Sequence, residues 1–197
     1  EFTKAVEAYG QAASAGQTEQ AAAAALQTLC LACEEAERNP SPEILLAEQA
    51  RTCEERGAWA EAESVYRKLL AMAEGSNEPI HSKYGRISKV QLDLGRLFLL
   101  QGDFAKARES AVAATAAARI TELSPLLIWA LEREAYCALR LNDLPGAQAA
   151  ATEGVWIVEP GPLWDGFRAR SWVARARCHV AAGNYNLAEQ DLISSQP

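Results

Sequence analysis

A short motif recurs five times along the chain, and its spacing constrains the fold more than any other feature. Each copy begins with Gly or Asn and carries Ala five residues later. Consecutive copies start 41, 45, 40 and 41 residues apart. Self-similarity at a period of this size is typical of repeat proteins, in which one small unit recurs and stacks on its neighbours. The motif copies start at Gly16, Gly57, Gly102, Asn142 and Gly183.

The residue types in the motif predict a turn between two closely packed helices. Gly and Asn accept the left-handed backbone that often ends a helix. Two positions later the residue is mostly large and apolar or aromatic: Thr18, Trp59, Phe104, Leu144 or Tyr185. Seven positions before the turn the residue is small in four of the five copies: Tyr9, Ala50, Gly95, Ala135 or Ala176. We therefore expect a small residue on the incoming helix to face the motif Ala on the outgoing helix, where the two helices approach closely.

Proline residues separate the predicted hairpins from one another. After Gly102, apolar residues recur at spacings of three and four, which is one face of a helix. Ser41 precedes Pro42, which places an N-cap side chain before a proline of the first turn. No segment alternates with a period of two, so no sheet is expected. The predicted hairpins are 2–38, 42–76, 79–121, 124–158 and 162–194.

This pattern resembles the tetratricopeptide repeat (TPR), most clearly in residues 95–107 and 56–70. Trp172 also occupies the place of the family's first-helix Trp. The period exceeds the family's usual 34 residues and is similar to the long repeats of kinesin light chains and of large bacterial regulators. The resemblance implies an all-α fold: one α–α superhelix over 1–197, a TPR-like solenoid of about five hairpins. It also implies that the incoming helices line a concave groove.

Composition narrows the classes of function. The net charge of −7 and a pI of about 5.0 disfavour nucleic acid as a partner, and no apolar run is long enough for a membrane span. The chain begins without Met or a signal peptide, so we expect a fragment of a larger protein. Five cysteines without a secretory signal favour a reducing compartment, such as the cytoplasm, over a disulfide framework.

Few residues suggest catalysis. Cys30 and Cys33 form a lone CxxC, but a zinc site needs two further ligands, so packing is the expected role. Cys53 and His179 share the register of the core-type Phe98, four residues before a turn, and are also expected to pack. No phosphate loop, HExxH motif or nucleophile elbow is present. We therefore expect no catalytic residue, metal or cofactor, and an enzyme is only a remote alternative.

One register on the incoming helices offers a candidate binding surface. Three arginines lie six residues before their turns, where Tyr136 also occurs, and the resemblance implies that this position faces the groove. Guanidinium groups hold carboxylates in a bidentate geometry, which suggests an acidic peptide or protein partner. The alternative is that Glu48, Glu55 and Asp93 pair with these arginines at helical spacing. The candidate groove residues are Arg51, Arg96, Arg177, Lys89, Arg170, Trp129 and Tyr136.

We predict a protein–protein interaction or scaffold module that binds a peptide or protein in the groove. The alternative is a ligand- or peptide-sensing array of a multidomain regulator. Trp129, Trp156 and Trp164 are expected in the core, with an interface role for Trp129 as the alternative. Groove positions that hold Asn in chaperone-type TPR domains are occupied here by Arg and other residues, so binding to the C-terminal tails of heat-shock chaperones is not expected. The sequence predicts no particular oligomeric state.

Overall fold

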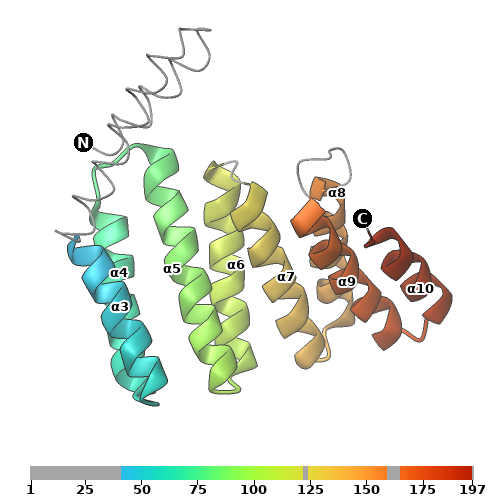
Figure 1. Cartoon of the computed structure of the whole chain (residues 1–197), viewed down its shortest axis with the longest axis horizontal. Helices are drawn as coiled ribbons and strands as arrows, with labels where there is room; N and C mark the ends of the chain where they lie inside the picture. The colour runs from blue at the N-terminus through green and yellow to red at the C-terminus, as the bar shows by residue number, and fades with distance from the viewer. Residues whose placement is uncertain (1–40, 122–123, 159–164, 197) are drawn as a thin grey trace, which may run out of the picture. The chain divides into compact units, whose positions relative to one another are not determined.

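The computed structural model describes residues 41–121, 124–158 and 165–196, which form helices and no strand within those ranges (Figure 1). The all-α prediction is confirmed. The first predicted hairpin, with Cys30 and Cys33, lies outside the described residues. The helices are α3 (Pro42–Glu55), α4 (Trp59–Gly75), α5 (Ile80–Leu100), α6 (Phe104–Thr121), α7 (Ser124–Arg140), α8 (Leu144–Val158), α9 (Asp165–Ala181) and α10 (Tyr185–Ser194).

The chain divides into two compact units, Glu1–Glu48 and Gln49–Pro197. Only the start of α3 is described in the first unit. There the Ser41 hydroxyl accepts a hydrogen bond from the Ile44 N–H at 3.4 Å, and the helix begins at Pro42, as predicted for an N-cap followed by a first-turn proline. The second unit contains the remaining helices. A single array over the whole chain stays a prediction.

The four described turns all end their incoming helix in the predicted left-handed conformation. The φ angles of Gly57, Gly102, Asn142 and Gly183 lie between 60° and 75°. At each turn the N–H of the next residue donates to a carbonyl five residues back, at 2.8–2.9 Å. The N–H of the left-handed residue itself donates to the carbonyl three residues back, at 2.9–3.1 Å. This is the Schellman pattern, which satisfies carbonyl groups that the helix end leaves without partners.

Small residues form the close contacts within each hairpin. The motif alanines Ala62, Ala107, Ala147 and Ala188 are buried, and so are the small residues seven positions before the turns. A Cβ atom built on Gly95 would lie 3.4 Å from the carbonyl oxygen of Ala107. The prediction that a small residue on the incoming helix faces the motif Ala is therefore confirmed at this hairpin. Because neither side chain extends far, α5 and α6 pack with their backbones close together.

Helices of the second unit pack in chain order, each against the next, from α4 to α10. The incoming helices also contact one another, α5 against α7 and α7 against α9 (Figure 1). Ion pairs link the outgoing helices of neighbouring hairpins: Arg119 on α6 lies 2.7 Å from Glu153 on α8. The incoming helices therefore form one continuous side-by-side layer, on which the candidate site lies.

The prediction of core positions for the tryptophans is wrong for Trp156, which is 66% exposed on α8, and for Trp129, which is 41% exposed on α7. Trp164 lies outside the described residues. Trp172, in contrast, is buried, with the Arg175 guanidinium 4.5 Å from its ring centroid. No described helix is both long enough and apolar enough to cross a membrane.

Candidate binding groove on the incoming helices

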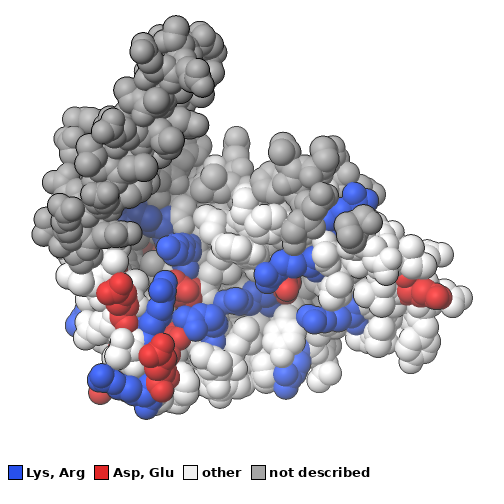
Figure 2. All heavy atoms as spheres, viewed as in Figure 1, with Lys and Arg blue, Asp and Glu red and all other residues white. Residues whose placement is uncertain are grey.

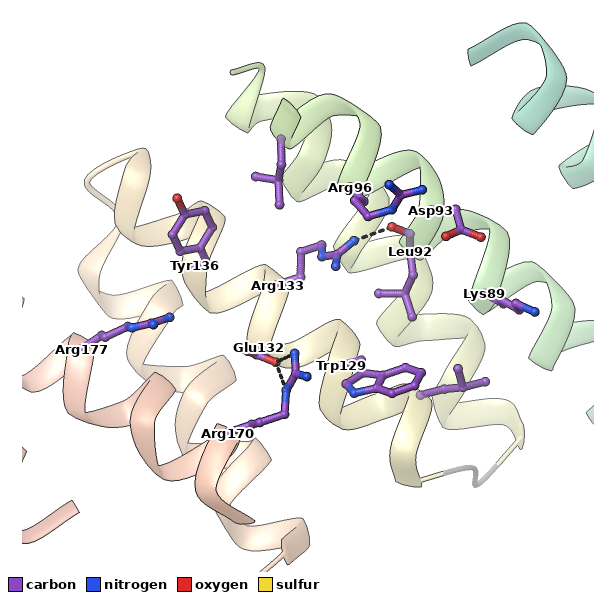
Figure 3. Close-up of a pocket in the computed structure, with 12 residues that line it drawn as sticks. Lys89, Leu92, Asp93, Arg96, Trp129, Glu132, Arg133, Tyr136, Arg170 and Arg177 are labelled. Carbon is purple, nitrogen blue, oxygen red and sulfur yellow. Dashed lines mark hydrogen bonds and ion pairs between the residues drawn. The ribbon is translucent and has the colours of Figure 1, made fainter. Parts of the chain in front are cut away.

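A groove of about 430 Å³ opens across α5, α7 and α9 (Figure 3). Five of its lining side chains are cationic and two are carboxylates, although the whole chain carries a net charge of −7. Figure 2 shows Lys and Arg side chains as a band across the middle of this face. The groove is therefore a local basic surface on an acidic protein. Its lining residues are Lys89, Leu92, Asp93, Arg96, Leu99, Leu126, Trp129, Glu132, Arg133, Tyr136, Arg170 and Arg177.

The structure brings six of the seven predicted groove residues to this one place. Arg51, on α3, is the exception, since it does not line the groove. Sequence reasoning missed Arg133, which lies three residues before Tyr136 on the same helix, and its groove-facing neighbour Glu132. The available signal was the helical spacing itself, because residues three and four apart share a face. Whether these residues bind a partner stays a prediction.

Arg96 is held by the preceding hairpin. Its guanidinium donates to the two carboxylate oxygens of Glu54 at 2.6 and 3.0 Å, and to the Tyr66 hydroxyl oxygen at 3.2 Å. The Tyr66 hydroxyl donates in turn to Glu54 at 2.9 Å. Burial, followed by the hydrogen bond to Glu54, raises the pKa of Tyr66, so the phenol stays protonated. The hydrogen bonds with Glu54 raise the pKa of Arg96 against the opposing effect of its own burial.

The carboxylate that holds Arg96 is none of the three that the sequence suggested. The alternative interpretation of the sequence pairs the arginines with Glu48, Glu55 and Asp93 at helical spacing. Glu54 instead reaches Arg96 from 42 residues away in the chain. Glu54 lies three residues before its turn. The same position in the later hairpins holds Leu99, Leu139 and Val180.

Arg170 and Arg133 are also engaged, in different ways. Arg170 on α9 lies 2.7 Å from Glu132 on α7, so it joins neighbouring hairpins. Arg133 donates to the Leu92 carbonyl oxygen at 2.5 Å, a bond that leaves its charge without a carboxylate partner. Burial lowers the pKa of Arg133, but an arginine remains protonated at neutral pH.

Two other cations of the groove form no ion pair with any residue in the described ranges. They are Lys89 and Arg177, and both are exposed. Arg177 has the same register as Arg96, yet Leu139 occupies the place that corresponds to Glu54. Arg177 therefore keeps its five N–H donors available to a ligand.

Apolar and aromatic side chains complete the groove. Trp129 contacts Phe167 at a centroid distance of 5.8 Å. Tyr136 accepts a hydrogen bond from Arg140 at 3.0 Å and meets Phe104 edge to face at 6.4 Å. These contacts fix the two rings in orientation while leaving part of each exposed to the groove.

Asp93 is the one groove carboxylate without a direct ion pair in the part of the chain that the structure describes. It lies beside Lys89 and Arg96 on α5 (Figure 3). Burial raises the pKa of Asp93, and the opposing attraction of Arg96, Lys89 and Arg51 does not cancel that effect.

The helical hairpins, the Schellman turns and the side-by-side incoming helices define the architecture as a TPR-like solenoid. Among solved structures, the chain is similar to a putative kinesin light chain from Podosopora anserina with nearly identical TPR-like repeats. The TM-score is 0.66 at 18% identity, over 98% of this chain and 92% of that chain. It is also similar to BtubC (BKLC) from P. vanneervenii, with a TM-score of 0.51 at 14% identity, over 98% and 87% of the two chains.

These similarities establish the shared fold. No protein-family model matches the sequence, and no curated protein matches it either.

Proposed function

We propose that the protein is an interaction module that binds an acidic segment of a protein partner in the groove of α5, α7 and α9. The observation that carries the proposal is the excess of five cations over two carboxylates in a groove on a chain with a net charge of −7. A ligand with carboxylates is attracted to such a surface and oriented by it.

The chemistry of the groove suits peptide carboxylates in particular. Arg177 and Arg133 have no carboxylate partner within the described ranges, so a ligand carboxylate does not need to displace an existing ion pair. Guanidinium groups bind carboxylates in a bidentate geometry. Trp129 and Leu126 provide apolar surface beside these charges, against which the apolar part of a peptide can pack.

The described residues offer little support for a catalytic role. No group of three or more His, Cys, Asp or Glu residues within those ranges is arranged to hold a metal ion. The described cysteines are buried, and burial raises the pKa of Cys137 and of Cys178 to about 11, which disfavours a reactive thiolate. We therefore propose a binding module without an active site of its own.

Fluorescence anisotropy with a labelled hexaglutamate peptide tests this proposal. The wild-type chain should bind the peptide, with an affinity that falls as salt rises. The double variant Lys89→Glu/Arg177→Glu should bind at least about tenfold more weakly, because two exposed groove cations become anions. The matched control Arg56→Glu/Lys68→Glu makes the same charge change on exposed residues away from the groove and should alter affinity by no more than about twofold. Equal losses in both variants, or no binding by the wild type, would refute the proposal.

A further inference from the structure

The two sides of the groove differ in how their charges are balanced. On the α5 side, Arg96 is held by Glu54, and Asp93 lies between Lys89 and Arg96 (Figure 3). On the α7–α9 side, Arg170 is neutralised by Glu132, and Arg133 reaches across to the Leu92 carbonyl oxygen of α5. Arg177 is left with no carboxylate partner among the described residues. Asp93 is therefore the only groove carboxylate whose charge remains available to repel an incoming anion.

Charged and titratable groups face Asp93 from every helix packed around it. Arg51 and Glu54 act from α3, Tyr66 from α4, Lys89 and Arg96 from α5, and Arg133 from α7. Four of these six are cations, and one of the four, Arg96, is already engaged by Glu54. Asp93 thus places a negative charge among the cations that a ligand carboxylate would otherwise approach.

We infer that Asp93 is the specificity-determining residue of the groove: it acts as an internal carboxylate that excludes anions from the α5 side and confines a ligand's acidic group to Arg177. This inference rests on the proposed function, since it assigns a position to the anion that the groove binds. A ligand with acidic groups along its whole length meets repulsion at Asp93. A ligand that carries its acidic group at one end does not.

The geometry couples binding to a proton. Burial has already raised the pKa of Asp93, and an anion bound nearby raises it further, because it disfavours the ionised form. Binding of an anion along the whole groove therefore takes up a proton at Asp93, and affinity increases as pH falls through the raised pKa. No histidine lines the groove.

The test uses a labelled hexapeptide of cysteic acid, whose sulfonates stay ionised throughout the titration. Its affinity is measured by anisotropy from about pH 3.5, close to the ordinary range of a carboxyl group, up to about pH 8, with circular dichroism to confirm that each variant is folded. Wild-type affinity should rise about five- to tenfold towards the acidic end, as expected for removal of one nearby charge. Asp93→Asn should bind at all pH values at least as tightly as the wild type does at the acidic end of the titration, and its affinity should depend much less on pH. Glu109→Gln, an exposed carboxylate on α6, is the matched control and should retain the wild-type profile.

The outcomes separate the two proposals. In one outcome, the wild type binds, the double variant Lys89→Glu/Arg177→Glu does not, and Asp93→Asn keeps the wild-type pH profile and affinity. That result refutes the role of Asp93 and supports the groove as the binding site. If wild type and Asp93→Asn both fail to bind either acidic peptide at any pH, the proposed function fails, and the inference fails with it.

Discussion

Arg96 and Arg177 occupy the same position of the repeat, six residues before a turn, yet they differ in what surrounds them. Arg96 forms three hydrogen bonds to the preceding hairpin, whereas Arg177 forms no ion pair within the described ranges. The difference follows from one residue in the preceding hairpin, which is Glu54 for Arg96 and Leu139 for Arg177. At these two sites, repeat position determines where the arginine lies, and the residue opposite it in the preceding hairpin determines whether the arginine is held in an ion pair.

The physical basis of the difference is burial of the partner. The Glu54 side chain is only 7% exposed, so it needs both Arg96 and Tyr66 to offset the loss of its hydration. Leu139 instead packs against a cluster of buried apolar residues between α7, α8 and α9. It offers Arg177 no acceptor, and the guanidinium remains in the solvent-accessible groove.

The largest expected effect is on stability, from removal of Glu54. Glu54→Ala leaves Arg96 and Tyr66 without their shared acceptor, and should lower the free energy of unfolding by about 2 kcal/mol. The neighbouring exposed residue Glu55 provides the control, because Glu55→Ala should change the free energy of unfolding by less than about 0.5 kcal/mol. Urea unfolding followed by circular dichroism measures both. Similar values for the two variants would mean that Arg96 is not held by Glu54 as described.

The next largest effect is on binding, and it comes from giving Arg177 a carboxylate partner like the one that holds Arg96. Leu139→Glu places a carboxylate at the position that corresponds to Glu54, where it can pair with Arg177. We expect an affinity for hexaglutamate about tenfold lower, or about 1.4 kcal/mol. Leu139→Gln removes the same apolar side chain without adding charge, so it should bind clearly better than Leu139→Glu. Anisotropy titrations that give the two variants equal affinity would show that Arg177 does not depend on its cross-hairpin neighbour.

The smallest effect concerns Asp93 and the pH dependence of stability. The pKa of Asp93 is higher in the folded state than in the unfolded state. Protonated Asp93 therefore contributes its full share to the free energy of unfolding below the unfolded-state pKa, and this contribution is lost as pH rises through the folded-state pKa. Asp93→Asn should therefore be more stable than the wild type at neutral pH, by less than about 1 kcal/mol, and no more stable near about pH 3.5. Urea midpoints at the two pH values measure the difference. A variant that is less stable at neutral pH would show that ionised Asp93 is stabilised by its cations.

The sequence was sufficient for the fold because the repeat signals are local. Left-handed residues such as Gly102 and buried alanines such as Ala107 specify a helix–turn–helix hairpin by themselves, and their recurrence implies stacking. Spacing from the turn also placed Trp129 and Arg177 on the groove face, since helical geometry fixes direction.

The charge pairing within the groove could not be predicted in the same way. Glu54 and Arg96 are 42 residues apart, and Glu132 and Arg170 are 38 apart, so no helical spacing connects either pair. Their meeting depends on how far one hairpin is rotated against the next. The prediction that Trp156 is buried failed for a related reason. Its residue type indicated burial, but whether its side chain is covered depends on the neighbouring elements.

The claim that Arg177, and not Arg96, contacts the ligand is tested most directly by NMR of the arginine side-chain Nε–H groups. Spectra are recorded with and without the hexaglutamate peptide, and signals are assigned with Arg96→Lys and Arg177→Lys variants. We predict that the peptide shifts the signal of Arg177 and leaves that of Arg96 unchanged. A peptide that shifts Arg96 as strongly as Arg177, or that leaves Arg177 unaffected, would contradict the account.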